Sequence, residues 1–227
     1  MWNKIFVLLF IFLSFGSLAN NKGITLDISR VIFDSENSSE SFTMKNTSSN
    51  MVLLIRATVN DYYTDHDKEI PFFITPPLNR IDPNSDIQFR INKLDGAENL
   101  PKDRESIYAI NVLAIPPKKE KSEIQIALNT KIKLIFRPTE INNTLEIEKL
   151  KDKLILTKGV GGINIKNPTP YFATITKIKF NGISSNRPSE MIKPFSDITL
   201  EEKNAKTMSF SIINDFGGNS NMRTVSF

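Results

Sequence analysis

The sequence predicts an all-β protein made of two β-sandwich domains of immunoglobulin size. Apolar and polar residues alternate through many short runs that are separated by turn residues, which is the pattern of half-buried strands. No stretch keeps a 3.6-residue period over three turns, and Leu145–Leu150 is too short to count as a helix. Short strands at regular spacing are typical of antiparallel sandwiches.

The composition argues against most enzyme classes. Of the 227 residues, 40% are hydrophobic and 24% are charged, which is typical of a globular protein. The chain has no cysteine, which excludes disulfide scaffolds, thiol catalysis and cysteine zinc sites. Its one histidine, His66, leaves little basis for a histidine-pair metal site or a histidine-based triad. We therefore expect no catalytic residue, no metal and no cofactor. The formal net charge of +4 is too small to indicate a nucleic-acid partner.

Residues 1–19 have the pattern of a cleavable secretory signal. Lys4 precedes the apolar run Ile5–Phe15, and small residues follow at Ser17 and Ala19. A membrane anchor is the alternative, but a spanning helix needs about 20 apolar residues. Polar residues already begin at Asn20. We expect an exported protein whose mature chain begins after residue 19.

The candidate strands fall into two blocks on either side of a polar segment. The first block comprises Thr25–Phe33, Ser41–Lys45, Val52–Asn60, Ile87–Asn92, Ser106–Ile115 and Ser122–Arg137. The second comprises Lys153–Leu156, Gly162–Lys166, Phe172–Phe180, Asp197–Leu200, Thr207–Ile213 and Arg223–Phe227. Between them, residues 137–144 are polar and carry Pro138, as is usual at a domain boundary. We therefore assign one domain to residues 20–140 and a second to residues 141–227.

The run Ser122–Arg137 is the longest candidate strand. Its even positions form a nearly continuous apolar row of Ile124, Ile126, Leu128, Thr130, Ile132, Leu134 and Phe136. At roughly 3.3 Å per residue the strand would reach about 50 Å, longer than most strands. Two interpretations remain open. The row could be a long core strand, or part of it could project toward a partner, because an exposed apolar edge otherwise promotes aggregation.

Two basic residues occupy unusual places in these strands. Arg30 shares its predicted strand face with Leu26, Ile28 and Ile32, so a charge interrupts an apolar row. Lys133 faces away from the apolar row but lies deep within the long strand. Each has an ordinary structural explanation, since an inward charge protects a sheet edge and most strand lysines are solvated. Together they could also form a carboxylate clamp, with a planar guanidinium and a compact ammonium.

The segment Asn129–Pro138 resembles the long strand and hinge of the PapD-like periplasmic pilus chaperones. Further segments resemble the same family in the same order: Ser29–Phe33, Thr75–Ile81 with Pro83, Leu100–Tyr108, Asn111–Pro117, Asn167–Phe172 and Ile213–Gly218. The resemblance spans nearly the whole mature chain. The sequence departs from the family at Thr58, where a tryptophan is frequent, and this concerns local packing only.

The resemblance implies a boomerang of two immunoglobulin-like domains and a periplasmic, non-enzymatic chaperone. Such a protein binds and stabilises pilus or fimbrial subunits by donor-strand complementation and delivers them to an outer-membrane usher. By resemblance, Arg30 and Lys133 would bind the C-terminal carboxylate of the subunit. Ile124, Ile126 and Leu128 would form the donor strand, and this exposed strand would also permit self-association.

The resemblance also assigns Glu105, Arg137 and Asp215 to an ion network between the domains. Without it, three unrelated surface charges would be the simpler interpretation. The alternative function is an exported two-domain β-sandwich that binds carbohydrate or accompanies a hydrolase. Tyr62 and Tyr63 lie among Asp61, Asp65, His66 and Asp67, where we expect a solvated turn, with weak cation binding as the alternative.

Overall fold

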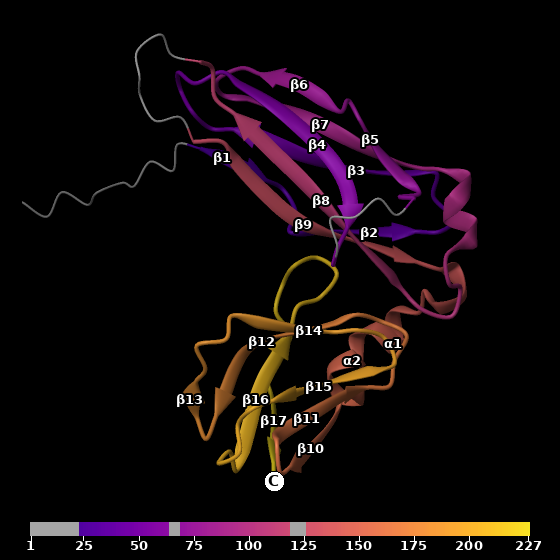
Figure 1. Ribbon diagram of the computed structural model, residues 1–227, viewed down its shortest axis with the longest axis vertical. Helices are drawn as coiled ribbons and strands as arrows, with labels where there is room; N and C mark the ends of the chain where they lie inside the picture. The colour runs from indigo at the N-terminus through magenta and orange to yellow at the C-terminus, as the bar shows by residue number, and fades with distance from the viewer. Residues whose placement is uncertain (1–22, 64–68, 119–125) are drawn as a thin grey trace, which may run out of the picture.

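The computed structural model describes residues 23–63, 69–118 and 126–227, so the expected signal at residues 1–19 lies outside it. The chain forms two β domains arranged end to end along the long axis of the molecule (Figure 1). The long strand is the last strand of the N-terminal domain, and a short 3-10 helix, Thr139–Ile141, follows it at the boundary between the domains. This arrangement confirms the predicted class of an all-β protein with two sandwiches.

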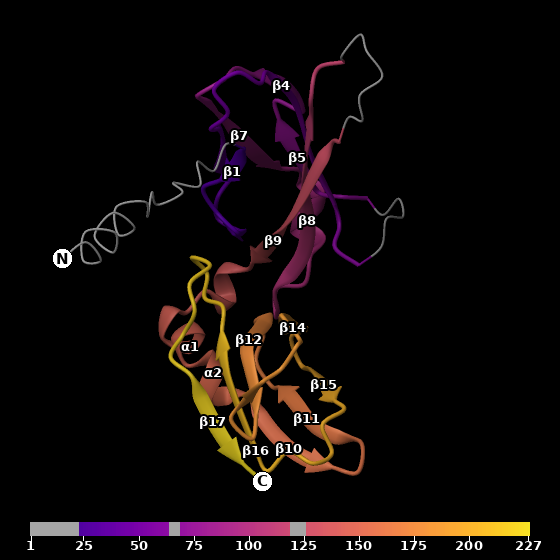
Figure 2. The ribbon, with the colours of Figure 1, turned by 90° about the vertical axis from the view of Figure 1, so that its left-hand side faces the viewer.

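The N-terminal domain consists of two sheets that face each other (Figure 2). The first sheet has the order β1 (Ile24–Leu26), β3 (Ser39–Asn46), β7 (Ser85–Lys93) and β5 (Phe72–Thr75). The second has the order β2 (Arg30–Asp34), β9 (Leu128–Arg137), β8 (Ser106–Ile115), β4 (Leu53–Asp61) and β6 (Leu78–Ile81). A 3-10 helix, Asp95–Asn99, connects β7 to β8.

The first predicted strand is wrong as a single element. Thr25–Phe33 divides into β1, which pairs antiparallel with β3, and β2, which pairs parallel with β9 in the opposite sheet. The strand changes sheets at residues 27–29, where the Asp27 carboxylate accepts a hydrogen bond from the Thr43 amide at 2.9 Å. Apolar alternation continues through this crossing, so the sequence pattern does not reveal it. As a result, Arg30 does not share a strand with Leu26 or Ile28.

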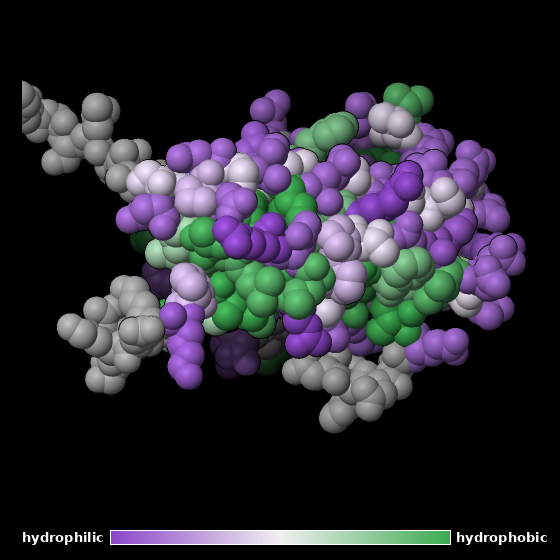
Figure 3. Space-filling model, turned by 90° about the horizontal axis from the view of Figure 1, so that it is seen from above, coloured by the Kyte–Doolittle hydropathy of each residue, from purple (hydrophilic) through white to green (hydrophobic). Residues whose placement is uncertain are grey.

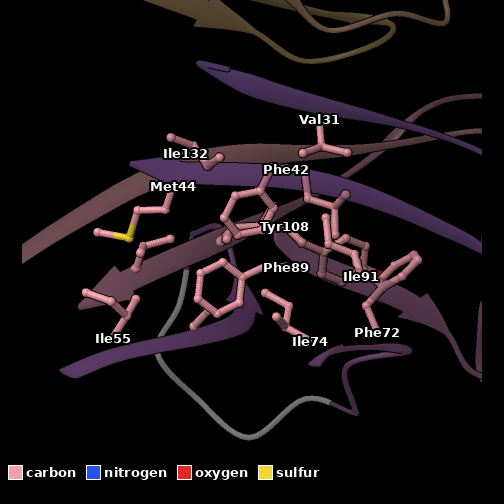
Figure 4. Close-up of a cluster of buried hydrophobic side chains, with 14 of the residues drawn as sticks. Val31, Phe42, Met44, Ile55, Phe72, Ile74, Phe89, Ile91, Tyr108 and Ile132 are labelled. Atoms are coloured by element: carbon pink, nitrogen blue, oxygen red, sulfur yellow. The ribbon is translucent and has the colours of Figure 1, made fainter. Parts of the chain in front are cut away.

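The core of the N-terminal domain is rich in phenylalanine (Figure 4). Phe42 stacks on Phe89 with ring centroids 5.3 Å apart, and Phe72 contacts Phe136 at 5.8 Å. The long strand β9 supplies Ile132, Leu134 and Phe136 to this core, all buried. The C-terminal part of the predicted apolar row is therefore a core row.

The C-terminal domain begins with two short helices, α1 (Thr144–Glu148) and α2 (Leu150–Lys153), and continues as strands. One sheet has the order β10 (Ile155–Gly159), β11 (Gly162–Asn167) and β15 (Ser196–Leu200). The other has the order β13 (Ile183–Ser184), β12 (Ala173–Phe180), β16 (Thr207–Ile212) and β17 (Arg223–Ser226), with β14 (Ser189–Ile192) also paired to β12. A second core, centred on residues such as Phe210 and Ile175, lies between them.

Helices α1 and α2 were not predicted because neither is long enough to show a helical period. Asn143 begins α1 by accepting hydrogen bonds from the Leu145 and Glu146 amides, as an N-cap residue does. Leu150 then packs into the core of the C-terminal domain. Within the described residues no helix is long and apolar enough to cross a membrane, and no cluster of acidic or histidine side chains could hold a metal ion.

Candidate functional site

Arg30 and Lys133 lie directly opposite each other on the parallel strands β2 and β9. Their neighbours Val31 and Leu134 are buried in the core, so both cations lie on the other face of the sheet, toward the C-terminal domain. From that domain Thr174 Oγ1 accepts a hydrogen bond from Lys133 Nζ at 3.1 Å, and the Ile213 carbonyl accepts one from Arg30 at 3.5 Å. Both domains therefore contribute to the surroundings of this pair.

Arg30 and Lys133 place two positive charges side by side. Among the described residues no carboxylate forms an ion pair with Arg30 or Lys133, and the buried Nε of Arg30 has no hydrogen-bond partner. Burial, together with the charge of Arg30, lowers the pKa of Lys133 to about 8. Burial also lowers the pKa of Arg30, although the negative charges of Asp215 and Glu105 oppose this effect. Two half-desolvated cations of this kind favour an added anion.

A free strand edge leads directly to the two cations. Strand β2 pairs only with residues 133–137 of β9, whereas β8 pairs with β9 along residues 128–136. On the β2 side of the sheet, residues 128–132 therefore have no strand partner among the described residues. Such an edge presents amide and carbonyl groups that can pair with another chain.

The apolar row of β9 continues out of the core along this edge. Leu128 lies on the same face as Ile132 but is 54% exposed, and Ile126 is 77% exposed. The predicted strand Ser122–Arg137 is shorter in the described part of the chain, since β9 begins at Leu128 and residues 126–127 are not in a strand. Ile124 lies outside the described residues.

Arg137, Glu105 and Asp215 meet at the domain boundary. The Arg137 guanidinium donates to Glu105 Oε1 at 2.8 Å from Nε and forms two hydrogen bonds with Asp215, at 2.6 and 3.0 Å. The other Glu105 oxygen accepts from the Phe172 amide of the C-terminal domain at 2.6 Å. The side chains of Arg137 and Glu105 are almost fully buried, while that of Asp215 is 30% exposed.

Burial and the contacts within this network shift the pKa values of Glu105 and Arg137. Burial raises the pKa of Glu105, although the charge of Arg137 opposes the effect. Burial also disfavours the charged form of Arg137, but the hydrogen bonds that it donates to Asp215 and the charge of Glu105 outweigh this effect and raise the pKa of Arg137. The guanidinium therefore stays charged and joins the two domains through both carboxylates.

A loop of the C-terminal domain lies against Ser29, the residue directly before β2. Gly217 adopts a φ of +82°, and a Cβ atom at this position would lie 2.3 Å from Ser29 Oγ. The loop is held by Asn214, whose side chain accepts from the Gly218 amide at 2.8 Å. Only glycine permits both this backbone conformation and this approach.

Tyr62 and Tyr63 directly follow β4, and Tyr63 is 50% exposed. Their rings contact edge to face at 5.1 Å, and each ring carries a lysine ammonium above it. Lys131 Nζ lies 4.7 Å from the centre of the Tyr62 ring, and Lys193 Nζ of the C-terminal domain lies 4.1 Å from that of Tyr63. Asp65, His66 and Asp67 lie outside the described residues.

Sequence reasoning assigned no functional role to these tyrosines or to Ser29, Thr174 and Gly217. No local pattern signals such partners, because the contacts join strands and loops of different domains. The tyrosine pair directly after a strand was visible in the sequence, but nothing near it indicated a lysine from the other domain.

A second exposed apolar surface lies at the end of the β4–β6–β8 region that is far from the C-terminal domain. Leu54 and Leu78 are 39% and 51% exposed on the outer face, and Leu113 and Ile115 are half-buried beside them. Figure 3 shows apolar side chains gathered among hydrophilic ones on the upper face of the molecule.

Comparison with known proteins identifies relatives over both domains. Residues 23–142 match the family of pili and flagellar-assembly chaperones through the PapD N-terminal domain, and residues 147–224 match the C-terminal domain of the pili assembly chaperone PapD. The chaperone protein PapD of Escherichia coli is 35% identical over 202 residues, covering 86% of this chain and 83% of that protein. The chaperone protein PmfD of Proteus mirabilis (strain HI4320) is 31% identical over 214 residues, covering 89% of this chain and 83% of that protein.

Solved structures agree with these matches. A chain from the Salmonella enterica SafA pilin in complex with the SafB chaperone superposes with a TM-score of 0.79 at 26% identity, covering 90% of this chain and 96% of that one. The Escherichia coli chaperone DraB superposes with a TM-score of 0.77 at 27% identity, covering 90% and 96%. All four of these proteins or complexes are named for chaperones.

Proposed function

The chain belongs to the PapD family of pilus-assembly chaperones, and we propose that it holds the C-terminal carboxylate of an unassembled pilus subunit between Arg30 and Lys133. It binds and stabilises pilus subunits by donor-strand complementation and delivers them to an outer-membrane usher. The observation that carries the proposed clamp is the pair of cations, without a carboxylate partner among the described residues, at the end of a free strand edge.

The geometry implies the direction of the bound subunit strand. A subunit strand on the free edge at residues 128–132 would lie in line with β2, because β2 occupies the same edge from Lys133 onward. Its C-terminal carboxylate reaches Arg30 and Lys133 only if the strand runs toward them. The subunit strand therefore runs parallel to β9, as β2 itself does.

The apolar row would complete the core of the subunit. We assign Ile124, Ile126 and Leu128 to the donor strand, and each aliphatic side chain contributes roughly 1.5–3 kcal/mol when fully buried. Backbone pairing along the edge adds a net of about 0.5–1.5 kcal/mol for each hydrogen bond. Fixing the terminal carboxylate would set the register, because a slip of one residue turns the apolar row to the wrong face.

The ion network at Arg137 would hold the two domains in the geometry that the clamp needs. Thr174 and Ile213 belong to the C-terminal domain, yet both contact the clamp residues of the N-terminal domain. The bonds of Arg137 to Glu105 and Asp215 join the same two domains. A buried network of this type contributes more to a specific geometry than to net stability.

The relatives place the chain in a periplasmic chaperone family, and we assign residues 1–19 to an export signal that is removed. Intact-mass measurement of protein recovered from the periplasm tests this assignment, since an uncleaved N-terminus would contradict it. We assign the exposed surface around Leu54 and Leu78 to contact with the usher, because a subunit bound along β9 would leave it accessible. In the absence of a subunit, the free edge of β9 offers a site for self-association.

The clamp can be tested with a synthetic peptide of about ten residues that alternates valine and threonine and has a free C-terminus. A control peptide of the same sequence has a C-terminal amide. We expect the acid to bind the wild-type protein at least about tenfold more tightly than the amide, since hydrogen bonds to charged groups contribute about 1.5–3 kcal/mol. Arg30→Ala and Lys133→Ala should abolish this difference.

The control variant is Lys166→Ala, because Lys166 is an exposed lysine on β11 of the C-terminal domain. It removes one positive charge and should keep the preference for the acid. Circular dichroism would verify that all three variants are folded. Equal binding of acid and amide to the wild-type protein would refute the clamp.

A further inference from the structure

We propose that the subunit tail carries an acidic side chain among its last three residues, and that Lys131 and Lys193 bind it beside the clamp. This inference rests on the proposed function, since it concerns the same tail. The two lysines come from different domains, and the tyrosine pair Tyr62–Tyr63 brings them to one place.

The tyrosines hold these two lysines in position. Lys131 Nζ donates a hydrogen bond to the Tyr62 carbonyl oxygen at 2.9 Å and also lies over the Tyr62 ring. Lys193 Nζ lies over the Tyr63 ring, and the two rings contact each other. An exposed lysine usually moves among many rotamers, so fixing the ammonium beforehand lowers the entropy cost of binding an anion.

The contacts do not neutralise the lysines. An aromatic ring attracts a cation through its quadrupole but carries no net charge. Within the described residues no carboxylate forms an ion pair with Lys131 or Lys193. Among the described acids, Glu105 and Asp215 are bound to Arg137, and Asp61, next to Tyr62 in the chain, accepts a hydrogen bond from the Tyr63 amide.

The position of Lys131 connects it to the path of the subunit. It lies on the free edge of β9, two residues before Lys133, and therefore on the same face of the sheet at roughly 6.6 Å along the strand. A parallel subunit strand on this edge would lie about 4.8 Å away. One of its last residues would thus point its side chain to the face that carries Lys131.

The positive charges of the site outnumber the one negative charge of a terminal carboxylate. Arg30, Lys133, Lys131 and Lys193 supply four cations, while Glu105 and Asp215 share the single charge of Arg137 and attract Arg30. The one carboxylate at the end of an uncharged tail therefore still leaves positive charge unbalanced. Charge complementarity between partners favours specific pairing and suppresses tails of the wrong charge. A second negative group on the tail satisfies this arrangement.

The experiment compares two peptides that differ only at the next-to-last residue, glutamate in one and glutamine in the other. Both have the alternating valine and threonine sequence and a free carboxylate, and binding is measured at low salt. We expect the wild-type protein to favour the glutamate peptide by about fivefold, the upper range for a partly exposed ion pair. The double variant Lys131→Gln/Lys193→Gln should bind both peptides equally, and raising the salt should reduce the preference of the wild-type protein.

The matched control is Lys45→Gln, since Lys45 is an exposed lysine on β3, in the other sheet of the domain. It removes one positive charge and should keep the fivefold preference. Equal affinity of both peptides for the wild-type protein, or a preference that persists in the double variant, would overturn the proposal. Failure of the clamp is a separate result, because then the amide form of either peptide would bind as well as the acid.

Discussion

Arg30 and Lys133 are paired across two parallel strands, so their side chains leave the sheet on one face and at one level. Like charges this close repel each other, and the lowered pKa of Lys133 reflects burial together with the charge of Arg30. In the free protein the arrangement is a cost to stability. A bound carboxylate would turn that cost into a favourable interaction, which is the basis of the predictions on Lys133.

Binding of a carboxylate-terminated peptide should weaken at alkaline pH. The pKa of Lys133 is about 8 in the free protein, and a bound anion raises it. Below about pH 7 Lys133 is charged in both states and affinity should be constant. Above about pH 8 the affinity should fall, by up to tenfold for each pH unit, until the pH reaches the pKa that Lys133 has in the complex.

Isothermal titration calorimetry at several pH values between about 6.5 and 9.5 measures this effect. Two buffers of different ionisation enthalpy should reveal proton uptake on binding above about pH 8. Tyr63 does not interfere, because burial raises its pKa to about 12. A constant affinity up to about pH 9.5 would show that Lys133 keeps an ordinary lysine pKa of about 10.4.

Lys133→Met should stabilise the free protein at neutral pH while abolishing peptide binding. The variant removes a half-buried cation next to Arg30 and keeps most of the length of the unbranched side chain, so we expect a gain of roughly 0.5–2 kcal/mol in the free energy of unfolding. Urea denaturation at about pH 7 measures it. A variant less stable than the wild-type protein at this pH would contradict the prediction.

The same gain should shrink at higher pH. Because the pKa of Lys133 is lowered in the folded state, that state binds fewer protons than the unfolded chain between about pH 8 and about pH 10.4. The wild-type protein therefore gains stability from Lys133 across this window, and the difference from Lys133→Met should decrease. Repeating the denaturation at about pH 9.5 gives the comparison.

Arg137→Met should destabilise the protein by about 3–5 kcal/mol. The substitution leaves the buried carboxylate of Glu105 without its charged partner, which is the costly way to break a buried ion pair. The double variant Arg137→Met/Glu105→Gln should recover part of the loss, because glutamine can still accept the hydrogen bond from the Phe172 amide. Equal stability of the single and double variants would argue against a buried charge as the cause.

Gly217→Ala should weaken peptide binding, and Gly182→Ala is its matched control. Both glycines have a positive φ, +82° and +81°, but only the new Cβ at residue 217 meets another atom, Ser29 Oγ at 2.3 Å. In each variant the alanine introduces backbone strain of order 1–3 kcal/mol. Only Gly217→Ala should also displace the loop beside Arg30.

Adding Ser29→Ala to Gly217→Ala should restore part of the peptide affinity, because it removes the atom at 2.3 Å. The next contact, with the Cβ of Ser29, is an ordinary 3.4 Å. Peptide affinities of the two glycine variants and the double variant are measured side by side. Similar losses of affinity in Gly182→Ala and Gly217→Ala would point to strain alone.

Much of the fold could be predicted from the sequence, because each strand of a sandwich has one buried face. Ser106–Ile115 was predicted with the bounds that β8 has, and the strands around Phe42, Ile55 and Phe89 agree within a few residues. Strands β5 and β6 were missed, because Pro76 and Pro77 between them indicated a loop. Strands β13 and β14 are too short to show alternation.

The pattern of apolar residues, together with the absence of cysteine and the order of the family segments, determined the class of the protein and singled out Arg30, Lys133 and Arg137. These are properties of the chain that do not depend on how distant parts meet. Only the tertiary structure decided that the first strand changes sheets, that Arg30 faces Lys133 across a parallel pair, and that Tyr63 meets Lys193. The physical reason is that such contacts depend on register and domain orientation, to which residues from all over the chain contribute.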